Sequence, residues 1–110
     1  MKLPDNVDAA LDNALLAGER AALATWIRDG KRDRGSCGGA VMILDGRSKL
    51  AKTAIARGIG YTDGMIVLPL PADIQSQNAD IPQAQYAAFR ESLEVAGFGP
   101  AIKKFWTYID

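Results

Sequence analysis

A short, uninterrupted apolar run at residues 40–44 limits the folds open to this chain more than any other segment. Five residues are too few for a helix of ordinary length, and Asp45 and Gly46 close the run with a turn signal. A run of this kind is typical of a strand that is buried on both faces. We therefore expect a sheet that contains residues 40–44.

Three other stretches have the residue spacing of helices. Apolar residues recur about every 3.6 positions through the first 30 residues. Gly18 lies in the middle of this stretch and glycine weakens a helix interior, so one long helix and two shorter ones are both open. A further helix is expected from its cap, Ser48, to about Arg57, and a last one from near Pro82 to Gly97.

Two more segments, residues 65–68 and 105–109, have the composition of strands. Helices between buried strands are typical of βαβ crossovers, so we expect one or two helices followed by strand, helix, strand, helix, strand. The predicted fold class is α/β or α+β: a small two-layer domain with three to four helices and a largely parallel sheet of about three strands. Trp26, Phe89 and Leu93 are expected to be largely buried.

The 110 residues predict a single domain spanning 1–110, with a helical segment 1–30, a basic, glycine-rich loop 31–39 and a βαβαβ core 40–110. Hydrophobic residues make up 48% and charged residues 24%, which is globular rather than disordered composition. No apolar run is long enough to cross a membrane, and the lone Cys37 favours a reducing compartment. We expect a cytoplasmic protein without membrane contact.

The residues that usually carry enzyme chemistry are scarce. The chain has no histidine, so the commonest general base and the usual partner of a cysteine nucleophile are missing. One cysteine without histidine also excludes a zinc site of the standard ligand set. Asp5, Asp8 and Asp12 share one helical face but lack the spacing of a calcium loop. We expect no cofactor, no metal and no enzymatic activity; an enzyme using carboxylates or Cys37 is the least favoured alternative.

Charge is distributed unevenly along the chain although the net charge is zero. Residues 31–57 hold seven basic side chains against two acidic ones, and the flanking segments are acidic. Part of this segment, the turn before the helix at Ser48, offers backbone amides that can hold a phosphate or carboxylate. The alternatives are a plainly capped helix start and acidic neighbours that fold back onto the basic segment. The candidate binding residues are Lys31, Arg32, Arg34, Arg47, Ser48, Lys49 and Lys52.

A second basic group, Lys103 and Lys104, precedes the aromatic segment 105–108. Cations beside aromatic rings are typical of proteins that bind single-stranded nucleic acid. Aromatic residues in a terminal strand are also common in protein cores, and the sequence favours that second interpretation.

Residues 37–41, 45–52, 75–77 and 88–93, with the closing Asp110, resemble segments of small uncharacterised proteins from bacteriophages and other mobile elements. The resemblance covers residues 35–110. It implies a phage or prophage accessory protein, a class rich in inhibitors of host machinery, and it assigns no site residues.

The scarcity of catalytic residues and the uneven charge predict a non-enzymatic binding protein that docks on a protein partner. The resemblance implies that this partner is a host protein or protein complex, which the protein modulates or inhibits. The alternative is a nucleic-acid-binding module that uses the basic segment 31–57, with residues 103–108 as a further contact. Oligomeric state is open.

Overall fold

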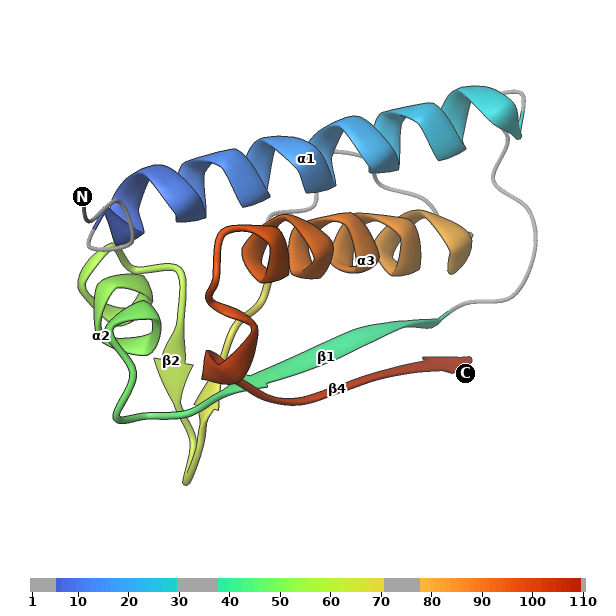
Figure 1. The fold of residues 1–110 in the computed structure, drawn as a ribbon. Helices are drawn as coiled ribbons and strands as arrows, with labels where there is room; N and C mark the ends of the chain where they lie inside the picture. Colours follow the sequence, from blue (N-terminus) through green and yellow to red (C-terminus); the bar gives the residue numbers. More distant parts are fainter. Residues whose placement is uncertain (1–5, 30–37, 71–77, 110) are drawn as a thin grey trace.

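The computed structural model describes residues 6–29, 38–70 and 78–109. Within these ranges the elements in chain order are α1 (Val7–Arg28), β1 (Gly38–Leu44), α2 (Lys49–Ala56), β2 (Tyr61–Thr62), β3 (Ile66–Val67), α3 (Asp80–Val95), a short 3₁₀ helix (Gly99–Ala101) and β4 (Ile102–Ile109). The helices lie on one side of the sheet, and α1 runs antiparallel to α3 (Figure 1). The expected small two-layer domain is confirmed, and its class is α+β.

The sheet has the strand order β2-β3-β1-β4, and every neighbouring pair is antiparallel. The expectation of a largely parallel sheet was therefore wrong, and the expected small sheet of about three strands has four. The crossovers through α2 and α3 do join strands that run the same way, but a third strand lies between them in each case. This is the split βαβ arrangement, βαββαβ, with α1 added before it. The βαβαβ interpretation missed β2, whose two residues are too short to leave a periodic pattern.

The first helix is continuous through Gly18, which settles the choice between one helix and two. Its start is capped by Asn6, whose side chain accepts the Ala9 N–H at 3.0 Å. Gly18 lies where α1 packs against α3, and a Cβ there would lie 2.9 Å from the backbone oxygen of Gln85 on α3. The glycine lets the two helices approach closely.

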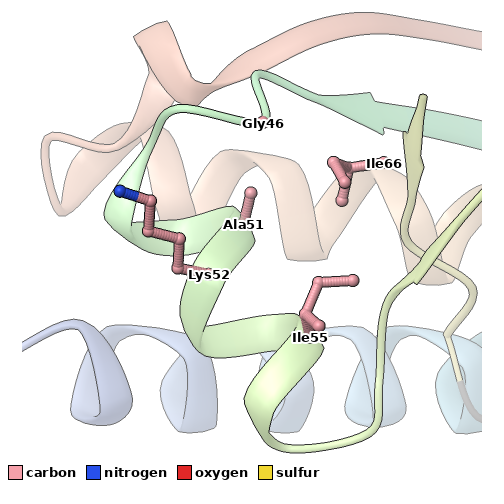
Figure 2. A pocket seen from close by; sticks show the side chains of 5 residues that line it. All are labelled: Gly46, Ala51, Lys52, Ile55 and Ile66. Carbon is pink, nitrogen blue, oxygen red and sulfur yellow. The ribbon is translucent and has the colours of Figure 1, made fainter. Parts of the chain in front are cut away.

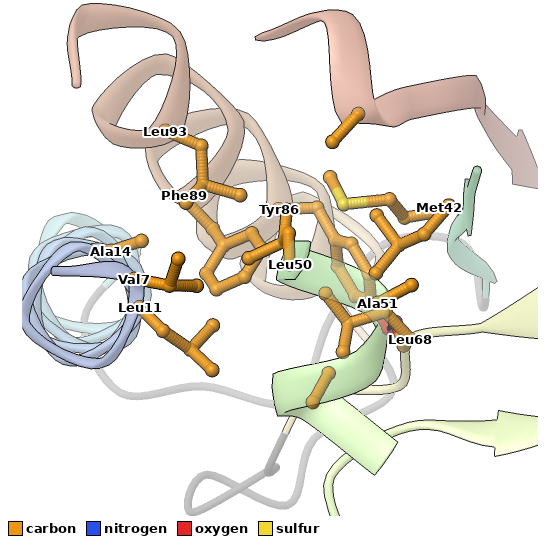
Figure 3. Close-up of a cluster of buried hydrophobic side chains, with 13 residues drawn as sticks. Val7, Leu11, Ala14, Met42, Leu50, Ala51, Leu68, Tyr86, Phe89 and Leu93 are labelled. Carbon is orange, nitrogen blue, oxygen red and sulfur yellow. Dashed lines mark hydrogen bonds between the residues drawn. The ribbon is translucent and has the colours of Figure 1, made fainter. Parts of the chain in front are cut away.

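The core lies between the helices and one face of the sheet (Figure 3). Its fully buried side chains come from all three helices and the sheet, and the largest are Phe89, Leu11, Met42, Leu44, Leu50, Leu68 and Leu93. The predicted burial of Phe89 and Leu93 is confirmed. Trp26 is only partly buried, because its neighbour Thr25 takes the inward position on α1.

The expected burial of residues 40–44 on both faces holds for only part of the run. Residues 42–44 are buried, whereas Ala40 and Val41 are partly exposed. The helices lie on one side of the sheet (Figure 1). Val41 points to the other side, whereas Ala40 packs against the core although it is partly exposed.

Candidate functional site

The face of the sheet that points away from the helices is a continuous surface, which we call the open face. Side chains alternate between the two faces of a strand. Met42 and Leu44 point into the core, so Val41 and Ile43 belong to the opposite face. The strand register extends this face to the neighbouring strands. The open face consists of Tyr61, Val67, Val41, Ile43, Lys104, Trp106 and Tyr108.

The orientation of β4 is fixed by Phe105, which points inward. Its ring centroid lies 6.4 Å from that of Tyr86, and the Arg90 guanidinium lies 5.1 Å from its centroid. The adjacent Lys104 and Trp106 therefore point outward. Trp106 is 44% exposed and Tyr108 is 42% exposed, so both keep a large part of their surface in water.

Tyr108 lies across β1 at Gly39, its partner in the register. A Cβ on Gly39 would stand 3.1 Å from the Tyr108 hydroxyl oxygen and 3.3 Å from the adjacent ring carbon. Glycine at this position thus leaves room for the ring to extend over the sheet. An aromatic ring that covers a cross-strand glycine is a recognised way to stabilise such a pair.

The middle of the open face is apolar. Ile43 is only 3% exposed although it points away from the helices, and Val41 and Val67 are partly buried. Rings stand on both sides of this centre, with Tyr61 on β2 and the two rings of β4. The face therefore combines an aliphatic floor with exposed aromatic rings.

Basic side chains from two distant segments lie around Asp45, just beyond the end of β1. Ile43 pairs with Lys104 and Leu44 with Ile102, which makes Lys103 the extra residue of a β-bulge. The hydrogen bond from the Arg47 N–H lowers the pKa of Asp45, and the charges of Arg47 and Lys103 lower it further. Arg47, Lys103 and Lys104 form what we call the basic cluster.

In the turn predicted to hold an anion, several groups are hydrogen-bonded to one another. The Asp45 carboxylate accepts the Arg47 N–H at 3.0 Å, and the Ser48 hydroxyl donates to the Asp45 carbonyl at 2.7 Å. Ser48 also accepts the Ala51 N–H at 3.1 Å, which confirms it as the N-cap of α2. The turn is therefore a capped helix start.

The remaining predicted binding residues are divided. Arg47, Lys49 and Lys52 are exposed, with the last two on α2. Lys31, Arg32 and Arg34 lie outside the described residues, as does Cys37.

One basic residue of the predicted segment is held by acidic neighbours. Arg57 at the end of α2 contacts Asp8 at 3.3 Å and Asp12 at 2.6 Å on α1. These ion pairs raise the pKa of Arg57, with the hydrogen bond to Asp12 as the largest cause. Acidic residues of α1 therefore do pack against the basic segment at this point, and Arg57 links α1 to α2.

Two shallow hollows lie near α2 and the β2–β3 hairpin. One has a volume of about 220 Å³ and is lined by Gly46, Ala51, Lys52, Ile55 and Ile66 (Figure 2). The other, of about 260 Å³, includes Ile43, Met65 and Lys103. Both are smaller than the ~300–1,000 Å³ of typical small-molecule pockets.

Within the described ranges, no group of three or more cysteine or acidic side chains is placed to hold a metal ion. No helix of the described chain is long and apolar enough to span a membrane.

Sequence reasoning undervalued the open face, although the signal is present. Residues 104, 106 and 108 alternate with inward residues, so a strand assignment already places Lys104, Trp106 and Tyr108 on one side. The sequence does not reveal which side the helices cover.

Comparison with protein-family models, curated proteins and solved structures found no match. The resemblance of residues 35–110 to proteins of mobile elements therefore stays a prediction.

Proposed function

We propose that this protein is a non-enzymatic domain that binds nucleic acid, using the open face together with the basic cluster. The observation that carries the proposal is that Lys104 lies on the same face of β4 as the exposed Trp106 and Tyr108, with Lys103 next to it in the chain. Cations supply attraction to phosphates and aromatic rings supply surfaces on which bases stack. This reverses the order of preference that the sequence alone suggests.

The local charge balance sets the expected strength of binding. Asp45 lies within the basic cluster, and the net charge of the chain is zero, so long-range attraction is limited. We expect affinity in the non-specific range of ~10⁻⁴ to 10⁻⁶ M near physiological salt, with tighter binding at low salt.

Fluorescence anisotropy with labelled oligonucleotides, single-stranded and duplex, tests the proposal at several salt concentrations. Lys103→Glu and Arg47→Glu should each weaken binding to all sequences alike, because phosphate contacts carry no sequence information. Arg20→Glu is the matched control, since Arg20 is an exposed arginine on α1. Absence of binding to both forms at low salt would contradict the proposal.

The second candidate is protein docking. The sequence favours a host protein as the partner, whereas the surface of α1 supports docking of a second copy of the chain. Three half-exposed aliphatic side chains, Leu16, Leu23 and Ile27, follow one side of α1, opposite the residues that pack in the core. A helix that is apolar on two sides is typical of one packed on both. A C₂ interface uses the same surface patch on both subunits, so this stripe can pack against its own counterpart on a second copy of the chain.

Sedimentation velocity over a range of concentrations tests this second candidate. Self-association should be weak, because one short helix face is smaller than a standard interface of ~800 Å² per partner. Leu23→Glu should abolish it, whereas Glu91→Lys, an exposed charge change on α3, should not. A monomer at every concentration would rule out docking of a second copy on α1.

A further inference from the structure

We infer that the nucleic acid is single-stranded and lies along β4, with bases stacked on Trp106 and Tyr108 and a phosphate held by Lys104. This inference rests on the proposed function and narrows it to one class of ligand and one part of the open face.

The three side chains form a row with regular spacing. They occupy alternate positions of one strand, so neighbours lie about 6.8 Å apart along it and point to the same side. The rings are 44% and 42% exposed. The Tyr108 ring lies over Gly39 of β1, and Trp106 is the register partner of Val41 on the same strand. Each ring therefore has a supported side and a side open to a base.

The shape of this surface favours single strands over a duplex. Bases stack on side chains only when they are unpaired, because base pairing and stacking within a duplex cover their faces. Recognition of duplex DNA commonly inserts a helix or a two-stranded ribbon into the major groove. The helices of this domain lie on one side of the sheet (Figure 1), and the strand register puts Trp106 and Tyr108 on the other side.

Charge around the row is complementary to a single phosphate backbone. Lys104 begins the row, and Lys103 and Arg47 continue the positive charge at the same end. Three phosphate contacts on a single strand correspond to a log–log salt slope of about −2. The rest of the open face is apolar apart from the Tyr61 hydroxyl, so we expect little discrimination among bases, as is usual for stacking.

Substitutions at Trp106 separate stacking from general attraction. Trp106→Leu keeps an apolar side chain on the strand but removes the ring, and affinity for a labelled oligothymidylate should fall about 5- to 150-fold. Trp106→Phe keeps a ring and should retain most of the affinity. The matched control is Trp26→Phe, at the only other tryptophan, which lies on α1 in the other layer. Circular dichroism confirms that each variant is folded.

The same titrations with a duplex of equal length complete the test. Preference for the single strand, lost in Trp106→Leu and kept in Trp26→Phe, supports the inference. Equal or tighter binding to the duplex, reduced by Arg47→Glu but not by Trp106→Leu, would overturn the inference and leave the proposed function standing. No binding to either form at low salt would overturn both and leave a protein partner as the occupant of the open face.

Discussion

The ring of Tyr108 lies over Gly39, so close that a Cβ on the glycine would stand 3.1 Å from the tyrosine hydroxyl oxygen. The next glycine, Gly38, faces the other way. A Cβ there would meet the backbone carbonyl of Tyr108 and the side chain of Ala79. Of these two adjacent glycines, Gly38 thus makes room for the backbone of Tyr108 and Gly39 makes room for its side chain.

We expect Gly38→Ala and Gly39→Ala to differ in their effect on stability. At position 38 the methyl group meets backbone that cannot move without separating β1 from β4, so the loss should be about 1–3 kcal/mol. At position 39 it meets the end of a side chain that can shift, and the loss should stay below about 1 kcal/mol. Urea unfolding of both variants measures the difference. Equal losses would show that the Tyr108 ring is as rigidly held as the backbone.

Gly18→Ala should destabilise the protein although alanine is the better helix former by about 1 kcal/mol. The new methyl group would lie 2.9 Å from the Gln85 oxygen and force α1 away from α3. We expect a net loss of up to about 2 kcal/mol, which is a typical overpacking cost of about 1–3 kcal/mol less the propensity gain of about 1 kcal/mol. The control is Ala24→Gly at an exposed position of the same helix, which should lose about 1 kcal/mol through propensity alone. A gain in stability from Gly18→Ala would contradict the close helix contact.

Tyr86 lies on α3 and forms a hydrogen bond with the chain that follows β3. We expect it to make the free energy of unfolding depend on pH in the alkaline range. Its hydroxyl accepts the Leu70 N–H at 3.0 Å, and burial raises the pKa of Tyr86. A raised pKa means that the folded state keeps its proton longer than the unfolded state. This contribution is therefore complete below the unfolded pKa, near pH 10, and is lost as pH rises towards the folded pKa.

Tyr86→Phe should cost about 1–3 kcal/mol at pH 7, because the Leu70 N–H loses its acceptor. The difference from wild type should shrink above about pH 10. Tyr61→Phe, on the open face, is the control and should stay within about 0.5 kcal/mol of wild type. Unfolding curves between pH 7 and 11 give both values, and a constant difference across this range would argue against the burial of the Tyr86 hydroxyl.

Phe89 is fully buried at the centre of the core, and Phe89→Ala should cost about 3–5 kcal/mol. Val95, at the end of the same helix, is 84% exposed, and Val95→Ala should change stability by no more than about 0.5 kcal/mol. Thermal unfolding of the two variants checks the assignment of the inner face of α3. Similar effects at both positions would contradict that assignment.

Features encoded within a few neighbouring residues could be predicted from the sequence. The cap at Ser48, the helix after it and the inward position of Phe89 follow from local spacing and hydrogen bonding. Trp26 was assigned to the core wrongly, because one helical position separates it from the inward Thr25. The periodicity of apolar residues does not distinguish between two adjacent helical positions.

Features that depend on distant segments were not predictable in the same way. A helix between two strands indicates a crossover, but it does not tell whether another strand lies between the pair it joins. The open face could not be predicted for the same reason, because it depends on how distant segments are arranged. Alternation places Trp106 and Tyr108 together, but only the folded structure shows that α1 and α3 lie on the other side of the sheet and that both residues stay partly exposed. The basic cluster likewise joins residues from opposite halves of the chain.

The position of β1 between β3 and β4 also has a consequence for the order of folding. Most of the β1 ladder is made with β4, at the far end of the described chain, whereas β2 and β3 are joined by a tight hairpin. Closing long loops costs entropy, and proteins dominated by such pairings fold slowly. The hairpin and the helices can form early, while β1 has one unpaired edge until β4 arrives. During that interval the apolar strand β1 can pair with other chains. We therefore expect the docking of β4 to be the folding step that protects the protein from aggregation.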